Sequence, residues 1–119
     1  MNVGIDLCHI PRMEALIARQ PGFIGRFFTE REQGLFQGAR IAQAVAANFA
    51  VKEAFSKALG TGVVGFNLVD VEVLRNERGA PYVLLHGEAQ TRMEDMGYET
   101  IRCSISHDRE YAVGLVVLL

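Results

Sequence analysis

The segment from Arg40 to Leu59 constrains the fold more than any other part of the chain. It reads RIAQAVAANFAVKEAFSKAL and is followed directly by Gly60. A glycine after the last periodic residue is typical of a helix C-terminus, because glycine adopts the left-handed conformation without strain. Gly62 and Gly65 make the exit from this segment flexible. The sequence therefore predicts one long central helix.

Shorter helices and strands are expected on both sides of the central helix. Thr29 is followed three residues later by Glu32, which is the capping-box pattern of a helix start. Residues 76–79 read as a hairpin-type turn, and Pro81 favours a strand start or an edge position. The expected strands cover 2–7, 68–74, 81–85, 101–106 and 111–119, and the further helices begin at 11, 29 and 87 and end near 20, 36 and 96. The predicted class is α+β, with a small antiparallel sheet packed by the long helix in a single domain, residues 1–119.

Composition narrows the possible partners and the compartment. The chain has 119 residues, half of them hydrophobic, a formal net charge of -2 and a pI near 5.9. One core is expected, with no overall attraction to nucleic acid or anionic membranes. Cys8 and Cys103 are too few for a disulfide scaffold and read as small core residues. The first residues do not resemble a secretory signal, and no apolar run approaches a membrane span. We therefore expect a cytoplasmic protein.

The last predicted strand, YAVGLVVLL at 111–119, is apolar on both faces. A sheet with one solvated side normally alternates apolar and polar residues along its strands. Two explanations are open: helices cover both faces of this strand, or a second copy of the chain covers one of them.

Glu53 and Lys57 are the first candidate site residues. Four residues apart on a helix, they could simply form a surface ion pair worth about 0.3–0.5 kcal/mol. They continue, however, the helical stripe of Ala42, Ala46 and Ala50, where another backbone can approach closely. Ten of the twelve basic residues are arginines, and both lysines lie within this helix. A compact ammonium group suits a point contact with phosphate, so this distribution favours a site.

Asp6 and His107 are candidates with ordinary alternatives. Asp6 ends a hydrophobic strand, so it could cap the following turn, or pair with Glu53 to hold magnesium. His107 lies at a turn between two strands, where it could be merely exposed or could donate to an anionic ligand. The contiguous Ser-His-Asp string at 106–108 does not indicate a hydrolase triad, because triad members meet through folding.

Three segments carry a family resemblance. They are GIDLCHIPRM at 4–13, NFAVKEAFSKALGTG at 48–62 and SISHDREYAVGLVV at 104–117. The middle segment is long and specific, and the order and separation of all three match over nearly the whole chain. On these segments the chain resembles the holo-acyl-carrier-protein synthase family of 4′-phosphopantetheinyl transferases.

The resemblance implies an enzyme that moves the 4′-phosphopantetheine arm of coenzyme A onto a serine hydroxyl of an apo acyl carrier protein. Adenosine 3′,5′-bisphosphate would be released. Asp6 and Glu53 would hold Mg²⁺, and Lys57 would face the phosphates of coenzyme A. Glu53 and Lys57 are then the expected catalytic residues: the lysine stabilises charge on the phosphate, and Glu53 or a metal-ordered water helps take the serine proton.

The resemblance also implies where the ligands and partners bind. His107 would lie near the phosphates of coenzyme A, and the loop with Gly79 and Pro81 near the adenine. Arg12 on the first helix would meet the acidic surface of the carrier protein. Family members form trimers with sites at subunit boundaries, which agrees with the second explanation for the doubly apolar strand.

Two positions depart from the family pattern. His9 stands where a glutamate is usual, and Asn48 where an arginine is usual. The first change would alter the surroundings of the metal and could favour Mn²⁺, and the second would remove a phosphate contact.

Two alternatives to the enzyme are a non-catalytic module that binds coenzyme A or a nucleotide, and a structural subunit. Neither has much need for both Asp6 and Glu53.

Overall fold

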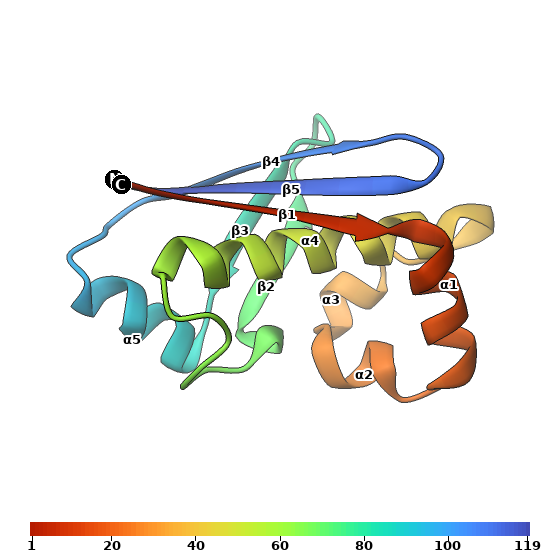
Figure 1. Ribbon diagram of the computed structural model, residues 1–119, viewed down its shortest axis with the longest axis horizontal. Helices are drawn as coiled ribbons and strands as arrows, with labels where there is room; N and C mark the ends of the chain where they lie inside the picture. The colour runs from red at the N-terminus through yellow and green to blue at the C-terminus, as the bar shows by residue number, and fades with distance from the viewer.

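The computed structural model describes residues 1–119, which fold around α4 (Ile41–Leu59) (Figure 1). The other helices are α1 (Ile10–Arg19), α2 (Phe23–Phe27), α3 (Glu30–Gln33) and α5 (Gly87–Asp95), with 3-10 turns at Gly38–Arg40 and Leu68–Asp70. The strands are β1 (Asn2–His9), β2 (Val71–Arg75), β3 (Pro81–Leu85), β4 (Ile101–His107) and β5 (Tyr111–Leu118). These elements confirm the α+β class. No helix combines the length and the apolar character that crossing a membrane requires.

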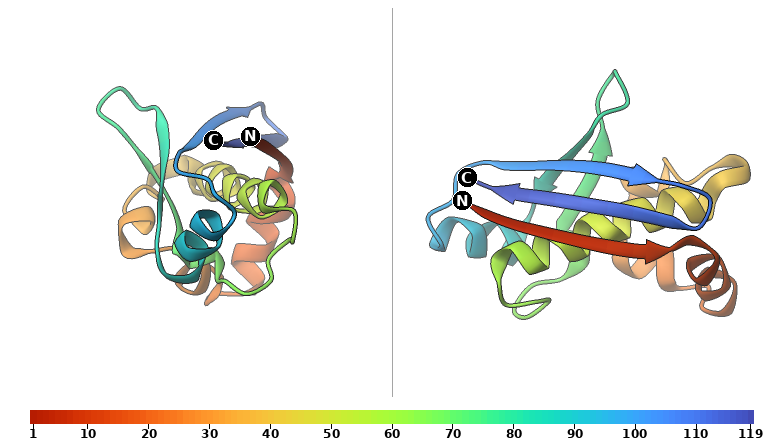
Figure 2. Two further views of the ribbon diagram at one scale, coloured as in Figure 1. Left: turned by 90° about the vertical axis from the view of Figure 1, so that its left-hand side faces the viewer. Right: turned by 45° about the horizontal axis from the view of Figure 1, so that its top comes forward.

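Two antiparallel sheets pack against α4. The larger has the strand order β1-β5-β4, and the smaller is the β2–β3 hairpin (Figure 2). In the larger sheet β5 is central, with Asp6 of β1 opposite Gly114 and Asn2 opposite Leu118. The two chain termini therefore lie side by side. This arrangement puts β1 and β4 at opposite edges of one sheet.

Glycines let the sheet approach α4 at backbone distance. A methyl group added to Gly4 would lie 1.9 Å from the carbonyl oxygen of Ala54. One added to Gly114 would lie 2.6 Å from the carbonyl carbon of Ala50. Ala50 belongs to the alanine stripe of the sequence, and its side chain is fully buried. The structure thus confirms that this stripe is covered by a closely packed backbone.

The replacement Gly4→Ala should destabilise the fold by at least about 1–3 kcal/mol, because its new methyl group meets the backbone of α4. Urea unfolding of the purified variant measures this loss. Gly25→Ala is the matched control, since no atom lies within 4 Å of a methyl group at that position in α2. The control should be as stable as the original chain or slightly more so. A Gly4→Ala midpoint equal to that of the control would contradict this packing.

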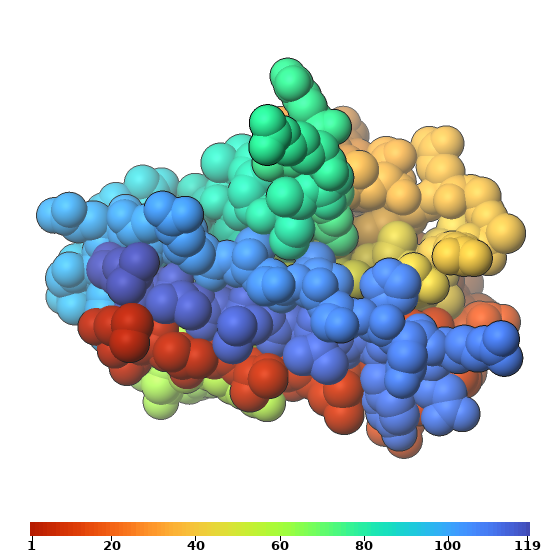
Figure 3. Space-filling model, turned by 90° about the horizontal axis from the view of Figure 1, so that it is seen from above, coloured from red at the N-terminus to blue at the C-terminus, as the bar shows by residue number.

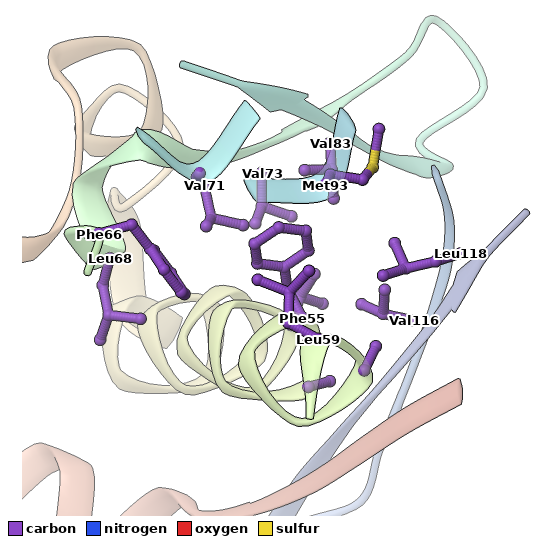
Figure 4. Packing of buried hydrophobic residues seen from close by; sticks show 14 residues of the cluster. Phe55, Leu59, Phe66, Leu68, Val71, Val73, Val83, Met93, Val116 and Leu118 are labelled. Carbon is purple, nitrogen blue, oxygen red and sulfur yellow. The ribbon is translucent and has the colours of Figure 1, made fainter. Parts of the chain in front are cut away.

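The core surrounds α4 on two sides. Figure 4 shows Phe55 and Leu59 of α4 pointing between the hairpin strands and β5. A second cluster joins the first half of α4 to the helices α1 and α2 and the segment after them. Its fully or nearly fully buried members include Met13, Phe28, Val45, Ala46 and Ala112. Together these clusters fix β1 and the start of α1 against the helix that carries the candidate site.

A buried ion pair ties α3 to α4. The Nζ atom of Lys52 lies 2.8 Å from Oε1 of Glu32, and both side chains are wholly inaccessible to solvent. The ammonium also donates to the carbonyl oxygens of Leu68 at 3.0 Å and Val71 at 2.6 Å, and lies 4.9 Å from the ring centre of Phe28. Burial raises the pKa of Glu32 and lowers that of Lys52, while the attraction between the two charges opposes both shifts.

Two predicted elements are shorter in the structure, and one helix was not predicted. The capping box of Thr29 and Glu32 is present, but the helix predicted for 29–36 ends at Gln33. The remainder turns inward, and Phe36 packs on Phe28 with ring centres 5.1 Å apart. The strand predicted for 68–74 begins only at residue 71, because the preceding backbone turns its carbonyl oxygens toward the buried ammonium of Lys52. The short helix α2 was not predicted.

The outer face of the larger sheet is uncovered, and it is apolar on β1 and β5. The side chains of β5 that face α4 are fully buried, whereas those on the outer face are only partly so. On β1 the outward residues Val3, Ile5 and Leu7 are 54–58% exposed. Figure 3 looks onto this face, where β1, β5 and β4 lie side by side at the surface. Helices therefore cover only one face of β5, so the first explanation of its apolar pattern is wrong.

Candidate active site

Asp6, Glu53 and Lys57 come together where β1 crosses α4. The Nζ atom of Lys57 lies 3.1 Å from Oδ1 of Asp6 and donates to the carbonyl oxygen of Ile5 at 3.0 Å. Lys57 forms its ion pair with Asp6 and not with Glu53. The surface pair between Glu53 and Lys57, the ordinary explanation of their spacing, is therefore absent. Its place is taken by a contact between residues 51 positions apart.

The two carboxylates influence each other. Partial burial raises the pKa of Glu53 most, and the charge of the nearby Asp6 raises it further. The ammonium of Lys57 lowers the pKa but does not cancel the shift. Groups of three or more histidine, cysteine, aspartate or glutamate side chains able to hold a metal ion do not occur in the chain. The site thus presents two mutually repelling carboxylates and one lysine.

The raised pKa of Glu53 predicts a pH dependence of stability. Its native pKa lies above the usual 4.5, so the native state binds this proton more tightly than the unfolded state does. Ionisation of Glu53 therefore lowers the stability of the native state, fully once the pH is above the native pKa and not at all below about pH 4.5. Without added metal, Glu53→Gln should unfold at a higher temperature than the original chain at pH 7, and the difference should shrink toward pH 4.5. Thermal unfolding across this range checks it; a less stable variant at pH 7 would contradict the electrostatic description.

Cys8 lies near enough to the carboxylate pair and to Arg12 for their charges to act on its thiol. Burial raises the pKa of its thiol to about 11, and the charges of Asp6 and Glu53 raise it while that of Arg12 lowers it. Arg12 is exposed near the start of α1, so the predicted carrier-docking residue lies on the same side of the molecule as the carboxylates. At neutral pH the thiol stays protonated and behaves as a small packing group, as the sequence suggested.

His107 and Gly79 line one cleft of about 410 Å³. The cleft lies between the start of α4, the end of β2 and the end of β4, and Arg40 and Arg75 contribute to its wall. The Nε2 atom of His107 is 3.3 Å from the side-chain nitrogen of Gln43. Pro81 is absent from the lining; it begins β3 and pairs with Arg75. The structure therefore brings His107 and Gly79 together, with Pro81 adjacent to the cleft wall.

The carboxylate pair and this cleft are separate within one chain. Asp6 lies on β1 and His107 on β4, at opposite edges of the larger sheet. Along α4, Glu53 follows the nearest cleft residue, Ala47, by six positions, which is roughly 9 Å along a helix axis. None of the three residues Asp6, Glu53 and Lys57 lines the cleft.

The two departures from the family pattern have other contacts. Nδ1 of His9 accepts a hydrogen bond from the backbone nitrogen of Arg12 at 3.2 Å, so His9 caps α1, and its ring lies 5.0 Å from that of Tyr111. By strand alternation it faces away from Asp6. Asn48 is fully buried and donates to Glu32 at 3.0 Å and to the carbonyl oxygen of Val73 at 3.0 Å.

Comparison with known proteins decides the family. A family model described as the 4′-phosphopantetheinyl transferase superfamily matches residues 2–116. The chain belongs to this superfamily. A holo-[acyl-carrier-protein] synthase from Alkaliphilus oremlandii is 41% identical to it over 119 residues, covering 99% of this chain and 98% of that protein.

Two solved structures resemble this transferase over nearly its whole length. The holo-[acyl-carrier-protein] synthase of Helicobacter pylori, in complex with coenzyme A, matches with a TM-score of 0.87 at 30% identity and covers 98% of this chain and 99% of its own. That of Bacillus anthracis, in complex with coenzyme A (3′,5′-ADP), matches with a TM-score of 0.81 at 34% identity, covering 98% and 94%. The predicted transferase fold is thereby confirmed.

Sequence reasoning missed the cleft arginine Arg75 of this transferase. Its position after the strand residues VEVL, directly before the hairpin turn, offered no motif and no helical periodicity. Arg40 stood out only as the first residue of the predicted central helix. A signal did exist for Arg75, because a cation at the end of a strand next to Gly79 lies near any ligand of that loop.

Proposed function

We propose that this transferase moves the 4′-phosphopantetheine arm of coenzyme A onto a serine hydroxyl of an apo acyl carrier protein and releases adenosine 3′,5′-bisphosphate. The observation that carries the proposal is the cluster of Asp6, Glu53 and Lys57, assembled from β1 and α4. The relatives named holo-[acyl-carrier-protein] synthase and the similar structure with coenzyme A support it.

Asp6 and Glu53 fit a magnesium ion. Their ligand atoms are carboxylate oxygens. Burial and the charge of Asp6 raise the pKa of Glu53, so the two carboxylates lack sufficient positive charge nearby. Magnesium in proteins is commonly held by one or two carboxylates and keeps waters and substrate phosphates as its other ligands. We therefore assign Mg²⁺ to this pair, with Mn²⁺ as a possible substitute. When bound, the ion neutralises charge on the phosphates during transfer.

Lys57 and Glu53 supply the remaining chemistry. The contacts of Lys57 with Asp6 and the backbone of Ile5 hold its ammonium in place, while 56% of its side chain stays exposed to an incoming phosphate. The ammonium stabilises charge on the phosphoryl group as it transfers. A carboxylate with a raised pKa accepts a proton more readily, which suits Glu53 to receive the proton of the carrier serine directly or through a water.

The coenzyme site is shared between two copies of the chain. The carboxylate pair and the His107 cleft lie at opposite edges of a sheet whose outer face is uncovered and is apolar on β1 and β5. Packing of these outer faces in a closed ring brings the β1 edge of one copy toward the β4 edge of the next. We propose a homotrimer in which His107 and the loop of Gly79 and Pro81 bind the adenosine end of a coenzyme A whose reacting phosphates lie at the neighbouring carboxylate pair.

The carrier protein approaches along α1. Arg12 is exposed there and close enough to the site for its charge to act on Cys8. An exposed arginine beside the reacting groups suits an acidic partner whose serine must reach Glu53. We place the reaction in the cytoplasm, where Cys8 and Cys103 remain free thiols.

Incubation with coenzyme A, Mg²⁺ and a panel of apo carrier proteins tests the proposal. Intact mass spectrometry should show one carrier gaining the mass of a single phosphopantetheine arm. A carrier whose acceptor serine is replaced by alanine should gain nothing. If the protein binds coenzyme A but no carrier gains mass, with Mg²⁺ or with Mn²⁺, the protein is the non-catalytic binding module instead.

A further inference from the structure

Arg75 carries a positive charge without a carboxylate partner. Its guanidinium donates to the side-chain oxygen of Asn48 at 2.9 Å and to the carbonyl oxygen of Leu74 at 3.2 Å. Both acceptors are neutral. The ion pairs of the chain join Lys52 to Glu32, Lys57 to Asp6, and Arg31 and His86 to Glu72, so none includes Arg75.

A buried network holds this charge in position. Asn48 uses its amide nitrogen on Glu32 and on the backbone of Val73, which leaves its oxygen directed to Arg75. Glu32 forms its ion pair with Lys52 at 2.8 Å; its charge also acts on Arg75, but the two side chains form no ion pair. Two of the five N–H groups of an arginine fork are used here, and the others remain free for a ligand.

The surroundings of Arg75 suit an anion. The cleft of about 410 Å³ that it shares with His107 has Arg40 on its wall and no aspartate or glutamate among its lining residues. Burial lowers the pKa of Arg75, yet an arginine keeps its proton in proteins. A planar fork with free donors binds two oxygens of one phosphate at once, which a lysine cannot do.

We propose that Arg75, positioned by Asn48, binds the 3′-phosphate of coenzyme A. The inference rests on the proposed function, in which the pyrophosphate lies at the carboxylate pair of the neighbouring copy. The phosphate that remains for the His107 cleft is the monoester on the ribose. Arg75 is thereby a determinant of specificity: it makes the enzyme prefer coenzyme A over dephospho-coenzyme A, which lacks only this phosphate.

The test compares the dissociation constants of coenzyme A and dephospho-coenzyme A, measured by calorimetry on the assembled protein. The original chain should bind coenzyme A at least about tenfold more tightly than dephospho-coenzyme A, as expected for a charge-assisted contact. Arg75→Gln keeps a donor for Asn48 and removes the charge, so it should weaken coenzyme A by about that factor and leave dephospho-coenzyme A nearly unchanged. Arg19→Gln, an equal loss of charge at the exposed end of α1 and outside the cleft, should keep the preference.

The outcomes separate this inference from the proposed function. If the original chain binds neither ligand, the proposed function fails. If it binds both and Arg75→Gln weakens both equally, or neither, the role of Arg75 is wrong while the function stands. Thermal unfolding checks that each variant is folded. Should Arg75→Gln not fold, Arg75→Lys and Arg75→Met take its place, and an unchanged preference in a folded Arg75→Met variant equally overturns the inference.

Discussion

Glu53→Gln should lower the rate of carrier modification by at least about a hundredfold while the protein stays folded. In the proposed mechanism, glutamine removes both the charge that would hold Mg²⁺ and the group that would accept the serine proton, and each loss alone costs about 10–100-fold or more. Because the ionised Glu53 is destabilising in the native state, the variant should unfold no more easily than the original chain. Initial rates of mass gain on the carrier, at saturating coenzyme A, measure the effect.

Glu88→Gln is the matched control for this experiment. Glu88 is exposed in the first turn of α5 and has no contact with the carboxylate pair. Its variant should modify the carrier at the original rate. A Glu53→Gln enzyme that retained more than about a tenth of that rate would remove Glu53 from the reacting centre, since a metal ligand and base cannot be so dispensable.

Lys52→Met should destabilise the protein by about 3–5 kcal/mol, enough to lower the unfolding temperature by about 10–20 °C. The side chain is wholly buried, and its loss leaves the carboxylate of Glu32 and the carbonyl oxygens of Leu68 and Val71 without their donor. Urea unfolding measures the change. Lys57→Met, the only other lysine replaced in the same way at an exposed position, should change stability by well under 1 kcal/mol.

A double replacement distinguishes the ion pair from simple packing. Lys52→Met combined with Glu32→Leu removes both charges and leaves apolar side chains of similar size, so much of the lost stability should return. If the double variant is less stable than Lys52→Met alone, the cost lies in packing and in the lost contacts of Glu32 with Thr29 and Asn48, and not in an uncompensated charge.

The sequence predicted the central helix and the strand pairs closely because their signals are local. Gly60 ends α4 in the left-handed conformation, and the turn after Arg75 joins β2 to β3, as expected from the residues themselves. The misses depended on distant partners. Leu68 belongs to a 3-10 turn because its carbonyl oxygen binds Lys52, and the helix from Thr29 is cut short because Phe36 packs on Phe28.

The sequence indicated the members of the candidate site but not their geometry. The presence of both lysines on one helix pointed to α4, but the pattern could not show that Lys52 is buried with Glu32 while Lys57 is exposed and pairs with Asp6. Nor could it show that Asp6 is the ion partner of Lys57, because strand pairing decides which face of β1 meets the helix. The glycines at 4 and 114, which allow this contact, have no distinguishing pattern in the sequence.

In the proposed assembly, the carboxylate pair of one copy works with the cleft of another. Mixed assemblies test it directly: Glu53→Gln chains and chains carrying His107→Ala with Arg75→Gln are co-expressed with different tags and purified through both. Each variant alone should be nearly inactive. Every trimer that carries both tags contains one site that combines an intact carboxylate pair with an intact cleft, so about a third of the original carrier-modifying activity should return. Mixed assemblies no more active than the two variants alone would contradict the account, because a site built within one chain cannot be restored by mixing.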